Sequence, residues 1–292
     1  MTGVTIAFDA NNHLGETPWW SVAEQALWWV NCENPPALHR WSPTTGAHQV
    51  WPMPQRIGGF APRAQGGVLV ALADGLYDLD LASGDLALRV ASPLPPHVKL
   101  HESACDAQGQ FWIGAYDHHY PADRTAAGGS YFRLDGDVLT PIVTGIAVAN
   151  GLAFSPDGAT LYIANTGRNA VDALDLDRAS GTVSNRRTFL RLAPGEGFVD
   201  GATVDCEGGY WLATVGAGAV RRYRRDGSLD RIIPLPFSNP TKMAFGGSDL
   251  KTLYVTSTRL AIPSTMVPTL PNGAIFALRP GETGIAACAY AG

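Results

Sequence analysis

The stretch "FVDGATVDCEGGYWLAT", residues 198–214, combines two features that decide the fold. Asp200-Gly201 precedes one apolar run, and a glycine-rich turn separates that run from a second one that contains Trp211. The second half of this pattern, a turn of Asp or Gly followed by a run that ends in an aromatic residue, recurs along the chain. Clear copies are "DAQGQFWIGAY" (106–116), "SPDGATLYIAN" (155–165) and "GSDLKTLYVTS" (247–257), and weaker copies are "SVAEQALWWVN" (21–31) and "RAQGGVLVALA" (63–73).

After each of these copies comes a short strand with a polar hairpin tip, as in "LHRWSPTTGA", "YFRLDGDV" and "VRRYRRDGSLD". The copies are about 40–55 residues apart, which is the period expected when each repeat is one four-stranded blade. The sequence therefore predicts an all-β fold, a six-bladed β-propeller whose four-stranded antiparallel blades surround a central channel. A length of 292 residues is compatible with a single propeller domain over residues 1–292.

Composition agrees with this fold and excludes some partners. The 33 Gly and 21 Pro suit many short strands and tight turns, and no long apolar stripe of helical period is present. A formal net charge of −5 argues against a nucleic-acid surface, which needs concentrated positive charge. The basic cluster "RRYRR" (221–225) is interpreted as a solvated, charged strand edge.

The cysteines and the start of the chain bear on location. Cys32, Cys105, Cys206 and Cys288 lack the spacing of a metal site, and Cys105 and Cys206 are expected to be small core residues. The first residues, "MTGVTIAFDANN", show no signal-peptide pattern, and no apolar segment approaches the length of a membrane span. We therefore expect a protein of the reducing cytoplasm without a membrane partner.

In a propeller the first strand of each blade lines the channel, so residues at these strands converge from distant parts of the chain. When the repeats are aligned, Glu16 of "LGETPWW", Asn150 of "VANGLAFS" and Asp200 of "FVDGATVD" fall at the same level. The other repeats place at this level Gly58 and Gly59, then Lys99, His101 and Glu102, and finally Asn239, Thr241 and Lys242.

Glu16, Asn150 and Asp200 together offer three oxygen donors, two of them anionic. Such a set suits one divalent cation, Ca²⁺, Mg²⁺ or Mn²⁺, and His101 nearby extends the choice to Zn²⁺ or Fe²⁺. Asn and Asp before Gly also occur in ordinary turns, and a Glu before Thr-Pro occurs in exposed loops. Their shared level in the repeats favours a functional site over three unrelated turns.

The spaced motifs "LGETPWW", "ANGLAFSPDGATLYIANT", "FVDGATVDCEGGYWLATVGAGAVRRYRRDG" and "PTKMAFGGSDLKTLYVTS" resemble those of the gluconolactonase or regucalcin-like (senescence marker protein) family, over nearly the whole chain. The resemblance implies a single divalent metal held by Glu16, Asn150 and Asp200. It also implies hydrolysis of a sugar lactone, a small-molecule substrate, to the aldonic acid.

The third blade departs from the family pattern of an Arg followed by an Asn-Asp pair, because this chain reads "KLHES" there, with Lys99, His101 and Glu102 at the matching positions. Lys keeps the positive charge of Arg but lacks its planar, two-pronged donor set. His101 can ligate the metal, bind a sugar hydroxyl or shuttle a proton, and Glu102 points away from the face of His101 and supports it. The change suggests a substrate other than plain gluconolactone, such as a modified or acidic sugar.

For the chemistry we expect the metal to polarise the lactone carbonyl and Asp200 to act as general base, while Lys99 and His101 orient the sugar. Tyr116, at the end of "FWIGAY", and His118, in the polar loop "DHHYPADRTAAGG" (117–129), are further candidates for substrate binding. His118 and His119 are expected to point in different directions.

Several alternatives remain open. Trp19 and Trp20 suit either sugar stacking or core packing. No G-x-S-x-G elbow supports a serine nucleophile. The chain can instead be a propeller that binds calcium or a small ligand without turnover, or an esterase or phosphotriesterase. We expect a monomer or weak homodimer, closed by pairing of 4–10 with 284–292.

Overall fold

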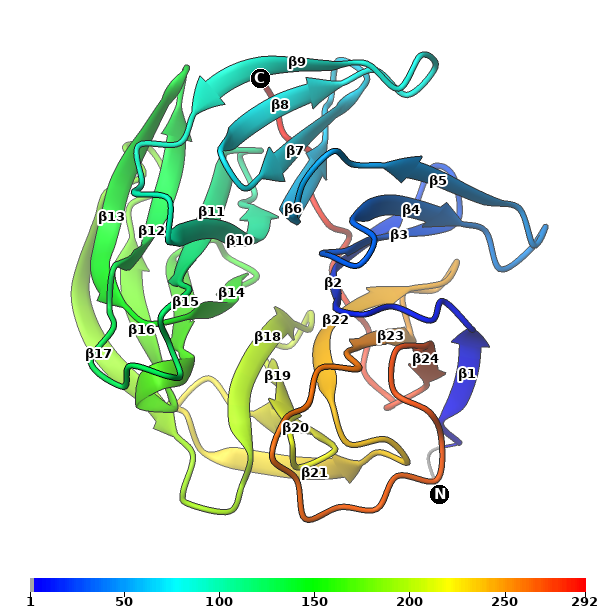
Figure 1. Ribbon diagram of the computed structural model, residues 1–292. Coiled ribbons are helices and arrows are strands. Elements are labelled where there is room, and N and C mark those ends of the chain that lie inside the picture. The colour runs from blue at the N-terminus through cyan, green and yellow to red at the C-terminus, as the bar shows by residue number, and fades with distance from the viewer. Residues whose placement is uncertain (1–2) are drawn as a thin grey trace.

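The computed structural model describes residues 3–292 and shows six four-stranded antiparallel sheets arranged around a common axis (Figure 1). The prediction of a six-bladed propeller is confirmed. The strands that face the axis are β2, β6, β10, β14, β18 and β22.

Chain order runs outward from the axis in five blades, and the sixth blade takes its outer strand from the N-terminal end. The first three blades are β2 (Gly15–Ser21), β3 (Ala26–Asn31), β4 (Ala37–Trp41) and β5 (His48–Pro52); β6 (Ile57–Pro62), β7 (Val68–Leu72), β8 (Gly75–Leu79) and β9 (Leu86–Ala91); and β10 (Val98–Cys105), β11 (Phe111–Asp117), β12 (Gly129–Asp135) and β13 (Val138–Ile146). The last three are β14 (Ala149–Phe154), β15 (Thr160–Asn165), β16 (Ala170–Leu176) and β17 (Val183–Arg191); β18 (Phe198–Val204), β19 (Tyr210–Val215), β20 (Ala219–Tyr223) and β21 (Leu229–Pro234); and β22 (Pro240–Gly246), β23 (Thr252–Ser257), β24 (Ile275–Leu278) and β1 (Thr5–Phe8). A short 3₁₀ helix, η1 (Thr166–Arg168), follows β15.

Burial falls from the axis outward within each blade. The second strand β3, "ALWWVN", is buried along its whole length, whereas the outer strand β5, "HQVWP", is largely exposed. Within residues 3–292 the buried apolar side chains form six clusters, one between each pair of neighbouring blades. Burial of these faces supplies the main driving force for closing the ring.

The turn between the first and second strands explains why acid, glycine and tryptophan recur together. In blade 5 one carboxylate oxygen of Asp205 accepts two backbone N–H groups of the turn at 2.8 and 3.0 Å, and the other accepts Trp211 Nε1 at 2.7 Å. Asp106 binds Trp112 Nε1 in the same way at 3.0 Å in blade 3. Trp112 and Trp211 thus pack between blades with their N–H groups satisfied.

The ring closes differently from the prediction. β1 pairs with β24, so the N-terminal strand does complete the last blade, but the C-terminal segment is not its partner. Residues 284–291 instead cross behind the ring from blade 6 toward blades 2 and 3, as the red trace in Figure 1 shows. There Tyr290 N donates to Pro62 O at 2.8 Å and Ala291 N to Gly109 O at 2.9 Å.

The C-terminal segment also determines the surroundings of Trp19. A cavity of about 180 Å³ lies between the ends of the inner strands and residues 285–288. Trp19 lines this cavity and its Nε1 donates to Cys288 O at 3.4 Å, while Trp20 stacks on Tyr254 with ring centroids 5.4 Å apart. Both tryptophans therefore pack in the propeller, which favours the core-packing alternative.

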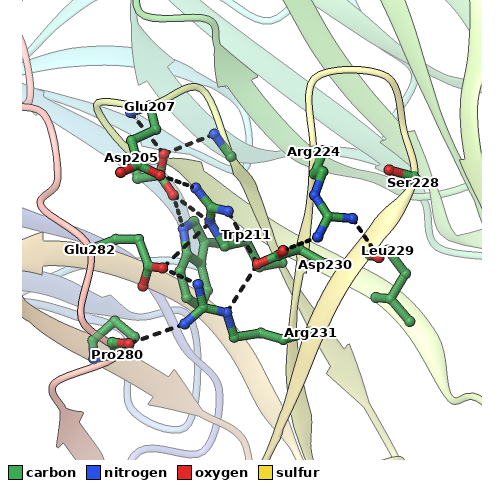
Figure 2. Close-up of polar contacts among 12 residues, drawn as sticks. Asp205, Glu207, Trp211, Arg224, Ser228, Leu229, Asp230, Arg231, Pro280 and Glu282 are labelled. Carbon is green, nitrogen blue, oxygen red and sulfur yellow. Dashed lines mark hydrogen bonds and ion pairs between the residues drawn. The ribbon is translucent and has the colours of Figure 1, made fainter.

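The interpretation of "RRYRR" as a solvated edge is wrong for its first two arginines. Arg221 and Arg222 lie on β20, which is flanked by β19 and β21 in the sheet. The side chains of both arginines are buried. Arg222 binds Asp205 at 2.8 Å and Asp230 at 3.1 Å, inside the network of carboxylates and arginines around Trp211 that Figure 2 shows.

Two smaller outcomes concern the cysteines and the membrane. Cys206 is exposed in the turn after β18 and not in the core, because β18 ends at Val204 and the turn to β19 begins at Asp205. Cys105 is only partly buried. Between residues 3 and 292 no helix has the length and hydropathy needed to cross a bilayer.

Asp205→Ala should lower the free energy of unfolding by about 3–5 kcal/mol, because it removes the acceptor of the Trp211 N–H and of two backbone N–H groups of the turn, and one of the carboxylates that pair with the buried Arg222. The exposed Asp226 of the same blade is the matched control, and Asp226→Ala should change stability by about 0.5 kcal/mol or less. Denaturant unfolding of the two variants measures the difference, and equal stabilities would contradict the role given to Asp205.

Candidate active site at one end of the channel

The three predicted metal ligands, together with His101 and Glu102, lie at β-bulges of inner strands. Pairing with the neighbouring strand is interrupted between Glu16 and Trp19 in β2, and between Asn150 and Ala153 in β14. The same happens in β10 and β18, between Leu100 and Ser103 and between Val199 and Ala202. A bulge bends the strand and redirects its side chains, so the polar residues leave the alternation of the ladder and turn to the axis together.

Glu16, Asn150 and Asp200 are buried, with exposed fractions of 1%, 4% and 9%. Glu16 Oε2 accepts the backbone N–H of Thr17 at 3.0 Å, and Asn150 Nδ2 donates to Thr166 Oγ1 at 3.0 Å. The amide oxygen of Asn150 has no hydrogen-bond donor among residues 3–292. The structure therefore brings the three predicted metal ligands to the same end of the channel.

The two carboxylates are placed where negative charge is costly. Burial raises the pKa of Glu16 to about 7, with the charge of Glu102 as a second cause, and Lys242 opposes the rise. Burial and the neighbouring carboxylates of Glu16 and Glu102 likewise raise the pKa of Asp200 well above its usual range. The effect of the Glu16 charge on the pKa of Asp200 indicates that the two carboxylates are neighbours.

A divalent cation fits this arrangement. Two buried carboxylates that repel one another and an amide oxygen without a donor are the hard oxygen ligands that such a cation prefers. Binding a cation would compensate the charge and satisfy the amide oxygen at once.

Glu102 and Lys242 form a buried ion pair next to the proposed metal ligands. Glu102 Oε2 also accepts the backbone N–H of Leu152 at 3.1 Å, and Lys242 Nζ donates to Ser103 O at 3.4 Å. Gly201 packs against this lysine so closely that an added Cβ would lie 2.5 Å from Lys242 Cβ. These contacts tie together the inner strands of four blades and agree with a supporting position for Glu102.

Arg56 is a residue of this region that the sequence analysis missed. It immediately precedes β6, and its Nη1 donates to Leu100 O at 2.9 Å while Nη2 lies 3.2 Å from His101 Nδ1. Its guanidinium also covers the ring of Tyr116, 4.8 Å from the centroid. The signal was available in "RIGGFAP", where a cation directly precedes the channel glycines Gly58 and Gly59.

Burial and the contact with Arg56 together determine the protonation and the tautomer of His101. A guanidinium only donates, so Nδ1 of His101 accepts and the proton of the neutral ring is on Nε2. Burial, followed by the charges of Arg56 and Lys242, lowers the pKa of His101 well below its usual range. His101 is therefore a neutral hydrogen-bond donor through Nε2, and of its three predicted roles this geometry suits hydrogen bonding best.

The remaining predicted substrate contacts lie beside Arg56 and His101. Tyr116 pairs with Lys99 in the β10–β11 ladder, and its ring is 5.5 Å from that of His101 and 6.3 Å from that of the exposed His118. Lys99 is half-buried, and its ammonium has no hydrogen-bonding or ion-pairing partner within the described part of the chain. One side of this end is thus aromatic and carries the cations Arg56 and Lys99, with the Glu33 carboxylate 4.0 Å from Arg56 Nε, while the proposed metal ligands lie on other blades.

These features define a propeller with a polar, acid-containing centre at one end of its channel. Residues 14–259 match the sequence profile of the SMP-30/Gluconolactonase/LRE-like region. The chain belongs to this family, which confirms the resemblance seen in the sequence.

Relatives and a solved structure extend this assignment. The 6-deoxy-6-sulfogluconolactonase of Pseudomonas putida is 39% identical, over 96% of this chain and 95% of the relative. The L-arabinolactonase of Azospirillum brasilense is 33% identical, over 99% of this chain and 95% of the relative. The crystal structure of regucalcin from Agrobacterium tumefaciens, described as a calcium-binding protein, is similar with a TM-score of 0.89 at 27% identity, over 99% of this chain and 97% of that one. Relatives with lactonase names confirm the prediction of a family of carboxylic ester hydrolases.

The metal-free protein should lose stability as the pH rises from 4.5 to about 7, because Glu16 ionises near 4.5 in the unfolded chain and near 7 in the folded one. Between these values the folded state binds more protons, so the free energy of unfolding falls with rising pH. Thermal melts in chelator across this range measure the loss, and a divalent cation added above pH 7 should restore stability. Glu16→Gln should flatten the metal-free profile; an unchanged slope would show that Glu16 is not its source.

Proposed function

We propose that this protein is a metal-dependent lactonase that hydrolyses a sugar lactone to the aldonic acid, with Glu16, Asn150 and Asp200 as the metal ligands. The observation that carries the proposal is the buried pair of carboxylates with raised pKa values beside an amide oxygen that lacks a donor. Membership of the gluconolactonase family and the lactonase names of the relatives support it.

A lactone is an ester whose carbonyl carbon is open to attack by water. A divalent cation bound by these ligands would polarise that carbonyl and offset the negative charge that develops on its oxygen. The negative charges of Glu16 and Asp200 would therefore hold the cation. The Glu102–Lys242 ion pair keeps the neighbouring strands in place.

Asp200 is the residue to which we assign the general base. Without a cation, burial raises the pKa of its carboxyl well above the usual range. A dication bound beside it would stabilise the ionised carboxylate, which is the form that can take a proton from the attacking water. His101 Nε2–H donates a hydrogen bond to a sugar oxygen, and Tyr116 and His118 form the adjoining wall.

The charge on the other side of the site suggests the substrate class. Lys99, whose ammonium has no partner among the described residues, lies opposite Tyr116 in the β10–β11 ladder, and the guanidinium of Arg56 covers the ring of Tyr116. This pair of cations suits a sugar lactone that carries an anionic substituent. The 39% identical relative is named for a lactone with a sulfonate group, which supports the same choice. An acidic sugar lactone is thus our proposed substrate, and 6-deoxy-6-sulfogluconolactone is the first probe.

The alternative of a non-catalytic calcium-binding propeller draws on the description of the regucalcin structure. Turnover distinguishes the two. Purified protein with added divalent cation should open lactones in a pH-stat assay and lose this activity in chelator, whereas metal binding without any turnover would favour the alternative.

Asp200→Asn should reduce kcat by about a hundredfold to ten-thousandfold, because the amide cannot take up the proton of the attacking water. Since Asn is nearly isosteric with Asp, the circular dichroism spectrum should be unchanged. The exposed Asp226 supplies the control, with Asp226→Asn retaining wild-type rates. Substantial activity in Asp200→Asn would remove Asp200 from the mechanism.

Lys99→Met should lower kcat/KM for 6-deoxy-6-sulfogluconolactone about tenfold or more, while kcat/KM for uncharged gluconolactone changes little, because only the anionic substituent uses the ammonium. The exposed Lys251 provides the control variant, Lys251→Met. The ratio of the two kcat/KM values is the measurement. An equal loss on both substrates would assign Lys99 a general role and contradict charge selection.

A further inference from the structure

A second group of metal-ligating side chains lies outside the proposed reaction centre. His97 directly precedes β10, Asp117 ends β11 and His119 follows two residues later, and the β10–β11 register places Val98 opposite Asp117. One ligand atom from each of His97, Asp117 and His119 lies within 4.8 Å of the others. None of the three belongs to the Glu16, Asn150 and Asp200 set.

The backbone around this group is held in place before any ion is bound. Asp117 is buried, and its Oδ1 and Oδ2 accept the N–H groups of His119 at 3.0 Å and Gly128 at 2.9 Å. His118 N donates to His97 O at 2.8 Å. The carboxylate is thus fixed, and the two histidines are attached to neighbouring backbone segments.

The imidazoles themselves remain free to adjust. The rings of His97 and His119 stack with centroids 4.5 Å apart, His119 is exposed, and its Nδ1 lies 3.3 Å from Asp117 Oδ1. Donors of a tetrahedral Zn²⁺ with bonds of about 2.0–2.1 Å are about 3.3 Å apart. The three ligand atoms lie within 4.8 Å of one another, so each pair is at most about 1.5 Å from that spacing.

We propose that His97, Asp117 and His119 form a second metal site that takes Zn²⁺ or a similar transition-metal dication, distinct from the proposed reaction centre. Two imidazole nitrogens and one carboxylate oxygen are a set that suits Zn²⁺, whereas Ca²⁺ and Mg²⁺ prefer oxygen ligands alone. The hydrogen bond from Gly128 to Asp117 Oδ2 is the kind of outer contact that orients a ligating carboxylate.

The position of the site gives it a consequence for the neighbouring loop. Residues 118–128 leave β11 beside Asp117 and return at Gly128, so an ion on Asp117, His119 and His97 fastens both ends of the loop to blade 3. This loop carries His118, whose ring faces Tyr116 at 6.3 Å. Occupancy of the second site therefore restrains one wall of the proposed substrate site without contacting substrate.

The test is a comparison of Zn²⁺ content. Wild-type protein and the His97→Ala/His119→Ala variant are incubated with excess Zn²⁺, freed of unbound ion by gel filtration and analysed for bound metal. The variant should hold one equivalent less than wild type. Because both side chains are partly exposed, the variant should still fold. Thermal melts of variant and wild type in chelator should therefore coincide.

Asp117→Asn is the second variant, since an amide keeps an oxygen acceptor for His119 N–H but removes the anionic ligand; it should also lose the additional Zn²⁺. The control is His39→Ala/His48→Ala, which removes the stacked histidine pair of blade 1, with ring centroids 5.4 Å apart, and should retain wild-type metal content. Tetrahedral Co²⁺ absorption provides a readout besides stoichiometry. It should disappear in His97→Ala/His119→Ala and in Asp117→Asn, and persist in the blade 1 control.

Equal Zn²⁺ content in wild type and His97→Ala/His119→Ala, or loss in the blade 1 control instead, would overturn the proposal. The same comparison in an Asp200→Asn background separates this site from the reaction centre. A difference of one equivalent that persists there supports the second site whatever the state of the first, and a difference that vanishes contradicts it.

Discussion

The charge balance inside the channel is the constraint on which the rest of this structure depends. Glu16, Glu102 and Asp200 are buried near one another, and the ammonium of Lys242 is paired with Glu102. Burial, and after it the negative charge of neighbouring carboxylates, raises the pKa values of Glu16 and Asp200, so the folded ring favours their protonated forms more than water does. Strong packing around such a centre compensates the free energy lost by burying the acids. A cation that bound there would neutralise the carboxylates and stabilise the folded state.

That packing comes from the ring. Six apolar clusters join neighbouring blades, so each blade packs against a neighbour on both sides. β1 pairs with β24 and supplies the outer strand of the last blade. The Asp205 turn adds a buried polar junction in which one carboxylate satisfies a turn, Trp211 and Arg222 together. Rigid blades hold the bulges of the inner strands at one level, which is how residues far apart in the chain meet with the precision that catalysis requires.

The two sides of the channel end differ in chemistry. Acidic and amide oxygens come from blades 1, 4 and 5, while Arg56, Lys99, His101 and Tyr116 come from blades 2 and 3. Burial, with the charge of Arg56 as the second cause, lowers the pKa of His101 and keeps its ring neutral, and the contact with Arg56 places the ring proton on Nε2. The change from the family's Arg and Asn to Lys99 and a neutral His101 thus keeps one positive charge at these positions and alters the hydrogen-bond donors that they offer.

Much of this could be read from the sequence, because strand periodicity and turn chemistry are local. The repeat of acid, glycine turn and tryptophan predicted six blades, and alignment of the repeats placed Glu16, Asn150 and Asp200 at one level. Only the tertiary structure showed that Arg56 reaches His101 in the next blade, that Arg221 and Arg222 are buried, that residues 284–291 cross behind the ring, and that His97 meets His119. Long side chains, loops and chain ends obey no short period, and their positions follow from which blades become neighbours when the ring closes.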